Sequence, residues 1–346
     1  MTKQLDAFMA TMVARSAPVT IDRAVALARA SYGLEAEATR LTGERDENFA
    51  LTTREGARYV LKIANPAESA AVAELPIAAL LHLQRTDAAL PCPRVLRALD
   101  GHTRVRFEDA AGLQRTACIL SYLPGRLLAD CSRSARQRAA CGRLGGRLSR
   151  ALAHFRHPAA DRAIIWDVRH VRRVSRLLEQ LPGFPYRSTA LELLGRAAPA
   201  IEARLPAMRR QVVHNDLNPR NILVDPAKED RVSGVIDFGD LTCTALIADV
   251  AVAAADLIAP DCTDPACARA CVLDVARAYH ECVPLLEPEL AMLGDLVAAR
   301  LLMSVVVHEW HVRHNPASRH FSPLGLDFMR AQFELADRML TEGIGP

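Results

Sequence analysis

A dense group of polar side chains beyond the middle of the chain could carry out phosphoryl transfer. His214, Asp216 and Asn221 come just before a short apolar run. Asp237 and Asp240 come just after a second one. A carboxylate can orient an attacking hydroxyl, and carboxylate and amide oxygens can bind the Mg²⁺ that bridges nucleotide phosphates. These side chains could therefore supply both a base and metal ligands.

A two-stranded ribbon would bring these groups together. The apolar runs at 222–224 and 235–236 flank a polar connection, 225–231, that contains Pro226. Short apolar runs bounded by turn residues are typical of buried strands. Such a ribbon carries both acidic groups to the same end. Asp and Asn also favour turns for purely structural reasons, which is the alternative interpretation, but two motifs in this order favour a site.

The two motifs resemble those of the protein-kinase superfamily in order and spacing. The resemblance implies that Asp216 is the catalytic base and that Asn221 and Asp237 are metal ligands. The chain is similar to the aminoglycoside-phosphotransferase-like branch, whose members phosphorylate small molecules. Within that branch, the segments HNDLNPRNIL, VSGVIDFGD, SYLPGR and FRHP…IIWD are similar to the hydroxylysine kinases, and the likeness runs from about Arg40 to about Pro316. The resemblance implies an α+β, two-lobed protein-kinase-like fold. We expect a small antiparallel-sheet lobe at 1–120, a hinge at 121–125 and a mostly helical lobe at 126–346.

The resemblance also implies an activity. We expect nucleotide-dependent phosphorylation of a hydroxyl on a small amine or amino acid, best matched by hydroxylysine, with Mg²⁺ as cofactor and ATP or GTP as donor. Homoserine, choline or ethanolamine, and aminoglycosides are alternative substrates. An alternative of a different class is a pseudokinase that binds nucleotide without turnover. The intact set of Asp216, Asn221, Asp237 and Lys62 argues against it.

Lys62 lies in an otherwise apolar strand-like run, and the chain has lysine only at positions 3, 62 and 228. Lysine is rarely buried unless it is paired, and an outward-facing lysine on an edge strand is the alternative. The resemblance implies that Lys62 binds the α- and β-phosphates and pairs with a Glu from the following helix, expected over 67–85. We choose Glu74 as this partner, with Glu68 as the alternative.

Two further segments are expected to contact the nucleotide. The turn Gly43 to Asn48 lies where the resemblance places the phosphate-covering loop, so we predict phosphate contacts from its backbone amides and from Asn48. An ordinary hairpin turn is the alternative. At the hinge, the backbone near Ser121 and Leu123 is expected to bind the base.

Two polar residues are expected to hold the catalytic loop. Asp249 lies in a strongly apolar helix, 245–258, and cannot stay buried there without partners. The resemblance implies that it accepts hydrogen bonds from the loop backbone and that His214 supports the same loop. Asp256 better fits a solvent-facing position. Asn215 stands where the branch commonly has Gly, and Asn tolerates positive φ better than most residues.

Three residues are candidates for the substrate pocket. Arg300 lies in an apolar helix, and a guanidinium can hold a substrate carboxylate bidentately. Snorkelling or pairing with an acid is the alternative for Arg300. Asp240 is expected to assist the metal or bind a substrate ammonium group. Trp166 lines the pocket or packs in the core.

Composition limits the remaining possibilities. Half of the residues are hydrophobic and 24% are charged, as in soluble globular proteins. A net charge of +3 is too small to indicate a nucleic-acid or membrane partner. We found no signal peptide or membrane span, so we expect a cytoplasmic protein with a helical leader over 1–35. The oligomeric state is left open. Cys262, Cys267 and Cys271 cluster without metal-site spacing, so we expect reduced thiols.

Overall fold

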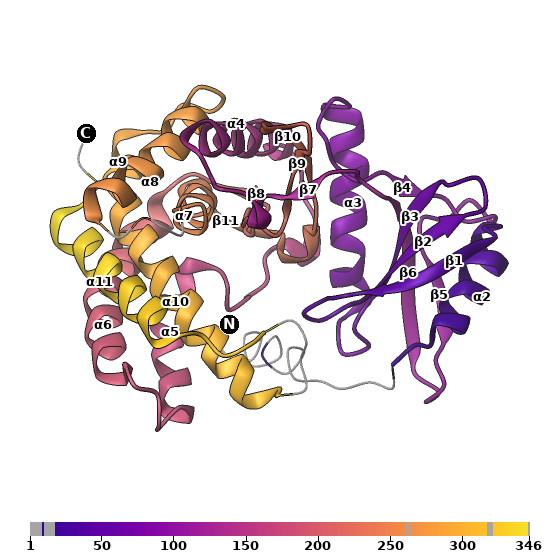
Figure 1. Cartoon of the computed structure of the whole chain (residues 1–346), viewed down its shortest axis with the longest axis horizontal. Coiled ribbons are helices and arrows are strands. Elements are labelled where there is room, and N and C mark those ends of the chain that lie inside the picture. The colour runs from indigo at the N-terminus through magenta and orange to yellow at the C-terminus, as the bar shows by residue number, and fades with distance from the viewer. Residues whose placement is uncertain (1–8, 10–17, 260–261, 263, 317–320, 345–346) are drawn as a thin grey trace.

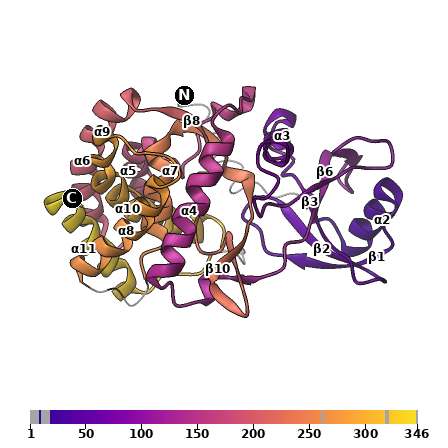
Figure 2. The ribbon, with the colours of Figure 1, turned by 90° about the horizontal axis from the view of Figure 1, so that it is seen from above.

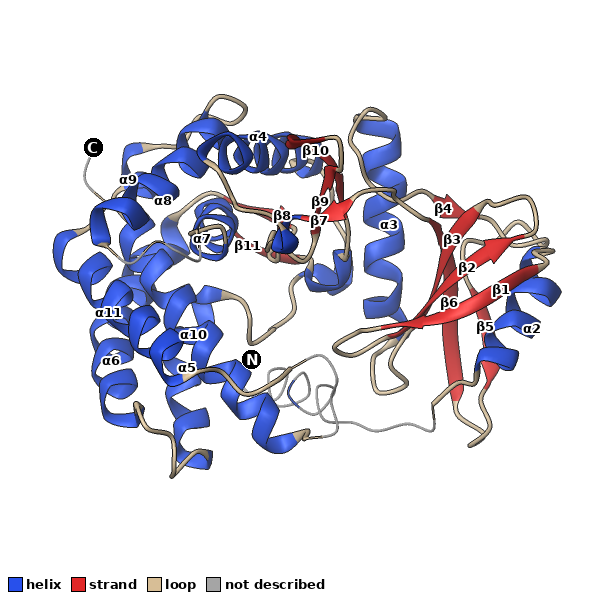
Figure 3. Cartoon of the chain, in the orientation of Figure 1, coloured by secondary structure: helices blue, strands red, loops and turns tan. Residues whose placement is uncertain are grey.

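The computed structural model describes residues 9, 18–259, 262, 264–316 and 321–344. The chain forms two lobes, a small one built on a sheet and a larger, mostly helical one (Figure 1; Figure 3). The predicted α+β, two-lobed class is therefore confirmed. Most of the predicted leader lies outside the described residues. Its described part contains helix α2 (Ile21–Tyr32).

The small lobe is a six-stranded antiparallel sheet in the order β1-β2-β3-β6-β4, with β5 also paired to β6. Its strands are β1 (Ala36–Leu41), β2 (Glu47–Thr53), β3 (Arg58–Ile63), β4 (Val95–Leu96), β5 (Val105–Glu108) and β6 (Gln114–Ser121). Leu61 and Ile63 of β3 are buried in the core that α2 shares with the sheet. Because side chains alternate along a strand, Lys62 between them points to the opposite face. That face is directed towards α3 (Ala70–Thr86) and the large lobe (Figure 1).

The large lobe is a bundle of helices around α7 and α10. Its helices are α4 (Ala135–Leu152), α5 (Val171–Leu177), α6 (Arg187–Arg204), α7 (Leu246–Asp256), α8 (Pro265–His280), α9 (Glu287–Leu290), α10 (Leu293–His314) and α11 (Leu326–Glu342). One described segment, Glu287–His314, is long and apolar enough to cross a membrane by length and composition, although 78% of its apolar window is buried inside the structure. Because α10 packs against α5, α6, α7 and α11, burial in the protein accounts for this composition.

The predicted ribbon is present in the large lobe. It consists of β9 (Ile222–Asp225) and β10 (Lys228–Val235), which pair antiparallel with Ile222 opposite Val235. A second pair, β8 (Arg210–Val213) and β11 (Thr242–Ala245), flanks the same site. Seen from above, β10 lies beside α4 on the side of the large lobe that faces the small one (Figure 2).

The connection between the lobes is fixed at one end. After β6 the chain crosses to β7 (Arg126–Leu127), which pairs with β9 of the ribbon. At Gly125, immediately before β7, a Cβ atom would lie 3.0 Å from both the Cβ of Leu223 and the carbonyl oxygen of Val224. Only glycine allows so close an approach of backbone to backbone. The exit of the connection is therefore packed directly against the ribbon.

Candidate active site

Asp216 lies in the loop before β9, and two amide side chains hold its carboxylate. Asn221 Nδ2 donates to Asp216 Oδ2 (2.6 Å) and to its carbonyl oxygen (3.0 Å), and Asn218 Nδ2 donates to Oδ1 (2.8 Å). Burial and, after it, the nearby Asp240 raise the pKa of Asp216 to about 8, against the opposing effects of Arg300 and Asn218. A carboxyl whose pKa lies near neutrality is suited to accept a proton from a hydroxyl.

Two buried side chains, those of Asp249 and His214, hold this loop by hydrogen bonds. Asp249 of α7 accepts a hydrogen bond from the Asn215 backbone N–H at 2.7 Å. Burial raises the pKa of Asp249 to about 7, and that hydrogen bond opposes the shift. His214 Nδ1 accepts from the Asp216 N–H (3.3 Å), while Nε2 lies 3.2 Å from the Ile236 carbonyl oxygen and joins the loop to β10. Asp249 and His214 therefore lie where the predicted support of the loop requires them.

Asn215 itself has a φ of 64°, in the left-handed region that Asn tolerates. Its side chain is fully buried, and neither amide atom has a hydrogen-bond partner among the described residues. Buried polar groups without partners destabilise a fold. The departure from Gly at this position therefore carries a cost that the sequence reasoning did not foresee.

Lys62 of the small lobe and Asp237 of the large lobe meet where the two lobes face each other, and this boundary is called the cleft. Lys62 Nζ lies 3.2 Å from Asp237 Oδ1 and 3.7 Å from Asp46 Oδ2. The Lys62 ammonium holds the pKa of Asp237 well below its usual range, against the opposing effect of burial. Because the Asp237 side chain is 52% exposed, its anionic oxygens remain open to the cleft. The predicted phosphate-binding lysine and the predicted metal ligand are therefore neighbours.

The turn between β1 and β2 reaches across the same cleft. Arg45 Nη2 lies 2.5 Å from Asp240 Oδ1, and its Nη1 lies 3.3 Å from Glu68 Oε1. The neighbouring Glu44 accepts a hydrogen bond from Trp166 Nε1 at 3.3 Å. Asp240 is thus paired with a cation of the small lobe. Sequence reasoning missed Glu44 and Arg45, because it considered only the backbone and Asn48 of this turn.

Arg300 lies on the large-lobe side of the site, close to the predicted base. Its Nη2 is 2.6 Å from Asp256 Oδ2 and 3.4 Å from Asp216 Oδ1. The guanidinium carbon lies 5.3 Å from the centre of the Trp166 ring, whose backbone carbonyl accepts from Nη1 at 3.4 Å. The prediction that Asp256 faces solvent is wrong, because its partly buried carboxylate pairs with the buried Arg300. Pairing with an acid, the alternative considered for Arg300, is present.

Comparison with known proteins agrees with this geometry. A family model described as the phosphotransferase enzyme family matches residues 37–299, a range that includes Lys62, Asp216 and Asp237. The chain belongs to this phosphotransferase family. It is 26% identical over 306 residues to the hydroxylysine kinase of Danio rerio, covering 84% of this chain and 83% of that protein. It is 29% identical over 246 residues to the homoserine kinase of Methylobacillus flagellatus, covering 70% of each.

The fold is also that of a solved phosphotransferase. An amicoumacin kinase in complex with AMP-PNP and Ca²⁺ superimposes with a TM-score of 0.70 at 15% identity, covering 94% of this chain and 95% of that one. The protein-kinase-like fold is therefore confirmed. With the family match, the chain is a small-molecule kinase, and nothing in these relatives indicates a pseudokinase.

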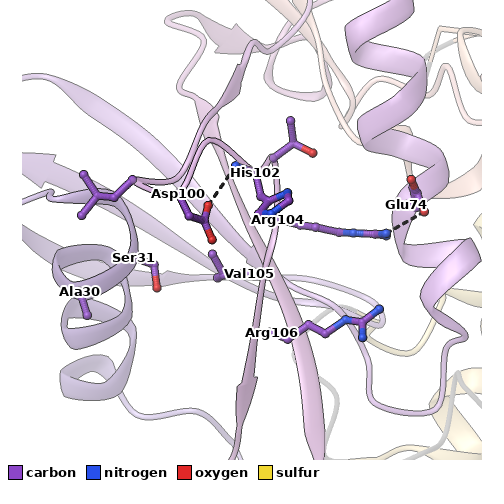
Figure 4. Close-up of a pocket in the computed structure, with 10 residues that line it drawn as sticks. Ala30, Ser31, Glu74, Asp100, His102, Arg104, Val105 and Arg106 are labelled. Carbon is purple, nitrogen blue, oxygen red and sulfur yellow. Dashed lines mark hydrogen bonds and ion pairs between the residues drawn. The ribbon is translucent and has the colours of Figure 1, made fainter.

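The predicted partner of Lys62 in this phosphotransferase is wrong. Glu74 pairs with Arg104 at 2.8 Å instead. Figure 4 shows the two side chains reaching towards each other at the edge of a hollow of about 710 Å³ beside α2 and β5. Helix α3 begins at Ala70 with Ser69 as its cap, and its Glu74 lines this hollow and not the site of Lys62. The alternative, Glu68, pairs with Arg45.

The structure also places three other residues of the phosphotransferase that are predicted to contact the nucleotide, Asn48, Ser121 and Leu123. Asn48 lies opposite Lys62 in the β2–β3 pairing, and its buried Oδ1 has no hydrogen-bond partner among the described residues. The Ser121 N–H donates to the Arg94 carbonyl oxygen, and the Ser121 hydroxyl accepts from the Arg94 N–H, each at 2.8 Å. Its side chain therefore secures the end of β6. Leu123 is partly buried, and base recognition there stays a prediction.

The cysteines of the phosphotransferase are all free thiols. The sulfurs of Cys262, Cys267 and Cys271 lie within 4.8 Å of one another, which their spacing did not predict. All three pack against the core of the large lobe, where thiols act as small hydrophobic side chains.

Proposed function

We propose that this kinase transfers phosphate to the hydroxyl of a small hydroxylated amino acid, with hydroxylysine as the best candidate. The observation that carries the proposal is the position of Arg300, a buried guanidinium 3.4 Å from the predicted base. A cation beside the base suits an acceptor that carries a carboxylate. The weak contact of Arg300 Nη1 with the Trp166 carbonyl, at 3.4 Å, is one that such a carboxylate can replace. The names of both curated relatives, hydroxylysine kinase and homoserine kinase, refer to hydroxylated amino acids.

We further propose Mg²⁺ and either ATP or GTP as cofactor and donor. The amicoumacin kinase carries AMP-PNP and a divalent cation. In this chain Asn221 and Asp237 fit a hard cation. Asp237 presents ionised oxygens to the cleft, and the Nδ2 of Asn221 is engaged with Asp216, which leaves its Oδ1 for a metal. The bound metal would neutralise phosphate charge.

The residues of the chain then have separate roles in the reaction. Asp216 orients the acceptor hydroxyl and takes its proton, while Lys62 binds the α- and β-phosphates. Trp166 and Arg300 form one wall of the acceptor pocket, and the remaining catalytic contribution is positioning. We expect this reaction in the cytoplasm, where the nine free thiols would stay reduced.

A substrate screen tests the proposal. Purified protein is incubated with Mg²⁺ and either ATP or GTP, and product is measured with hydroxylysine, homoserine, ethanolamine, choline and an aminoglycoside. We expect the highest kcat/KM for hydroxylysine. A preference for ethanolamine, choline or the aminoglycoside would overturn the assignment of an amino-acid acceptor.

Arg300 provides the sharper test. Arg300→Ala should cost about 2–5 kcal/mol in transition-state binding, the usual loss on truncating one partner of a buried charge pair. The loss should appear with a hydroxy-amino acid and largely vanish with the corresponding decarboxylated amine. Arg300→Lys keeps the charge beside Asp216 but lacks the bidentate fork, so it should separate the two roles. Equal losses on both substrates would mean that Arg300 only supports Asp216 and the fold.

A further inference from the structure

Arg45 is an unusual residue for a connecting turn, because its side chain is only 9% exposed. It lies between β1 and β2, in the segment that covers the cleft. Arginines in turns normally remain in water, and a buried one requires acidic partners. Two carboxylates that pair with it come from different lobes, Glu68 from the small lobe and Asp240 from the large one.

The guanidinium sits directly over the turn that follows the predicted metal ligand. A Cβ atom on Gly239 would lie 3.4 Å from Arg45 Nη2, and Gly239 follows Asp237 by two residues. Arg45 also contributes, after Lys62, to the lowered pKa of Asp237. Two cations of the small lobe, Lys62 and Arg45, therefore converge on Asp237.

The charges at this point suit an incoming polyphosphate. A magnesium-bound nucleoside triphosphate remains anionic, and in phosphoryl transfer the negative charge lies on the oxygens of the transferred group. Lys62 supplies one positive charge and is held by Asp237 and Asp46. Arg45 presents a planar fork of five donors, which can bind phosphate oxygens on one side while Glu68 holds the other.

We infer that Arg45 is a catalytic residue that binds the terminal phosphoryl group of the donor nucleotide. This inference rests on the nucleotide-dependent reaction proposed above. When nucleotide binds, the guanidinium exchanges Asp240 for an oxygen of that phosphoryl group and keeps its contact with Glu68. Arg45 stays protonated throughout. During transfer the bond from phosphorus to the leaving oxygen breaks, the bond to the acceptor oxygen forms, and the acceptor proton passes to Asp216.

Nucleotide binding without any acceptor tests the inference. The affinities for AMP-PNP and ADP are measured by titration calorimetry with Mg²⁺, for the parent protein, Arg45→Ala and Arg45→Lys. Arg45→Ala should weaken AMP-PNP binding by about tenfold or more, because a hydrogen bond to a charged group is worth about 1.5–3 kcal/mol. ADP lacks the terminal group, so its affinity should change by less than about threefold. Arg45→Lys keeps the charge but loses the planar fork. It should therefore weaken AMP-PNP binding less than Arg45→Ala does.

The matched control is Arg104→Ala. Arg104 is also an arginine of the small lobe paired with one glutamate, but its partner Glu74 lies outside the cleft. This variant should bind both nucleotides like the parent. If Arg45→Ala is too unstable to measure, the ratio of the two affinities in Arg45→Lys decides the matter.

Two outcomes would overturn the inference: equal weakening of AMP-PNP and ADP binding, or no weakening of either. The substrate proposal fails separately. A protein that loses AMP-PNP binding selectively on Arg45→Ala but phosphorylates no hydroxy-amino acid keeps the role of Arg45 and loses the acceptor assignment. If the protein phosphorylates hydroxylysine but Arg45→Ala leaves the ratio of AMP-PNP to ADP affinity unchanged, the acceptor assignment holds and the role of Arg45 is lost.

Discussion

Asp216 and Asp237 lie at the same end of one ribbon, yet the two sides of the cleft hold them in opposite charge environments. Asp237 faces the small lobe and is paired with Lys62, which holds its pKa well below the usual range. Asp216 faces the large lobe, where burial and Asp240 raise its pKa to about 8 despite Arg300. The difference shows how one fold provides both a permanently anionic ligand for a cation and a carboxylate that can accept a proton.

The largest expected effect comes from the Asp216 side of this comparison. Asp216→Asn keeps the size of the side chain but removes the base, so turnover should fall by about 10² to 10⁴ while nucleotide binding is retained. Single-turnover rates and calorimetry measure the two quantities. Asp337→Asn, which alters a half-exposed carboxylate on α11, is the control. Turnover within threefold of the parent would show that Asp216 is not the base.

At Asp237, by contrast, the expected effect is on nucleotide binding. In Asp237→Asn the metal loses an anionic oxygen, so Mg²⁺ should no longer strengthen nucleotide binding. We expect a loss of roughly tenfold or more in the affinity measured with Mg²⁺, since even the outer partners of metal ligands are worth about 10–100-fold. Binding without Mg²⁺ should change much less. A variant that keeps its full gain from Mg²⁺ would remove Asp237 from the metal site.

A third carboxylate, Asp249, sharpens the comparison because it touches neither nucleotide nor acceptor. Asp249→Ala should lower both stability, by about 1–3 kcal/mol, and turnover, because the Asn215 N–H loses its buried acceptor. Asp249→Asn keeps an oxygen for that N–H and should lose much less. An unchanged melting temperature in the alanine variant would contradict the supporting role.

The same pair of variants predicts a pH dependence. With its pKa raised from 3.8 to about 7, Asp249 keeps a proton in the folded state that the unfolded chain has already released. Its contribution to stability is therefore fully present below about pH 4 and is lost as the pH rises towards 7. Asp249→Asn should flatten the melting temperature between pH 5 and 7 relative to the parent. Identical slopes would show that Asp249 is already ionised in the fold.

The smallest effect is expected next to the base, at Asn215. Asn215→Gly removes the buried amide, whose unpaired groups cost roughly 1–3 kcal/mol, and suits the positive φ. Glycine also makes the unfolded chain more flexible, which lowers the free energy of unfolding by about 0.4–1 kcal/mol. A net gain of about 1 kcal/mol should raise the melting temperature by roughly 1–2 °C in a chain of this length. A lower melting temperature would show that the amide is hydrogen-bonded in solution, for instance to water.

Sequence reasoning succeeded where the site is contiguous. His214, Asp216, Asn221 and Asp237 stand on either side of two short strands, so local pattern alone predicts that they meet. The prediction for Lys62 came from the resemblance of its strand to that of the kinases, and the alternation of β3, with Leu61 and Ile63 buried, accounts for its direction in the structure.

Contacts between distant segments could not be predicted in this way. Arg45 and Asp240 are 195 residues apart, and nothing in either local pattern encodes their pairing. Asp256 was taken as solvent-facing because its own helix was considered without α10, which supplies Arg300. The error at Glu74 has a different origin. The predicted helix is present, but its periodicity does not say which of its faces meets the strands, and Arg104, just before β5, pairs with Glu74.

The close packing at Gly125 decides where the lobes can pivot. Because the backbone there lies against Leu223 and Val224, and β7 continues into pairing with β9, this end of the connection moves as one piece with the ribbon. Ser121 and Tyr122 are hydrogen-bonded to the backbones of Arg94 and Arg58 in the small lobe, so any opening must take up its rotation in the short segment between Tyr122 and Gly125. Because that segment lies next to β9, which follows the catalytic loop, such an opening would displace Lys62 relative to Asp216 without disturbing the loop.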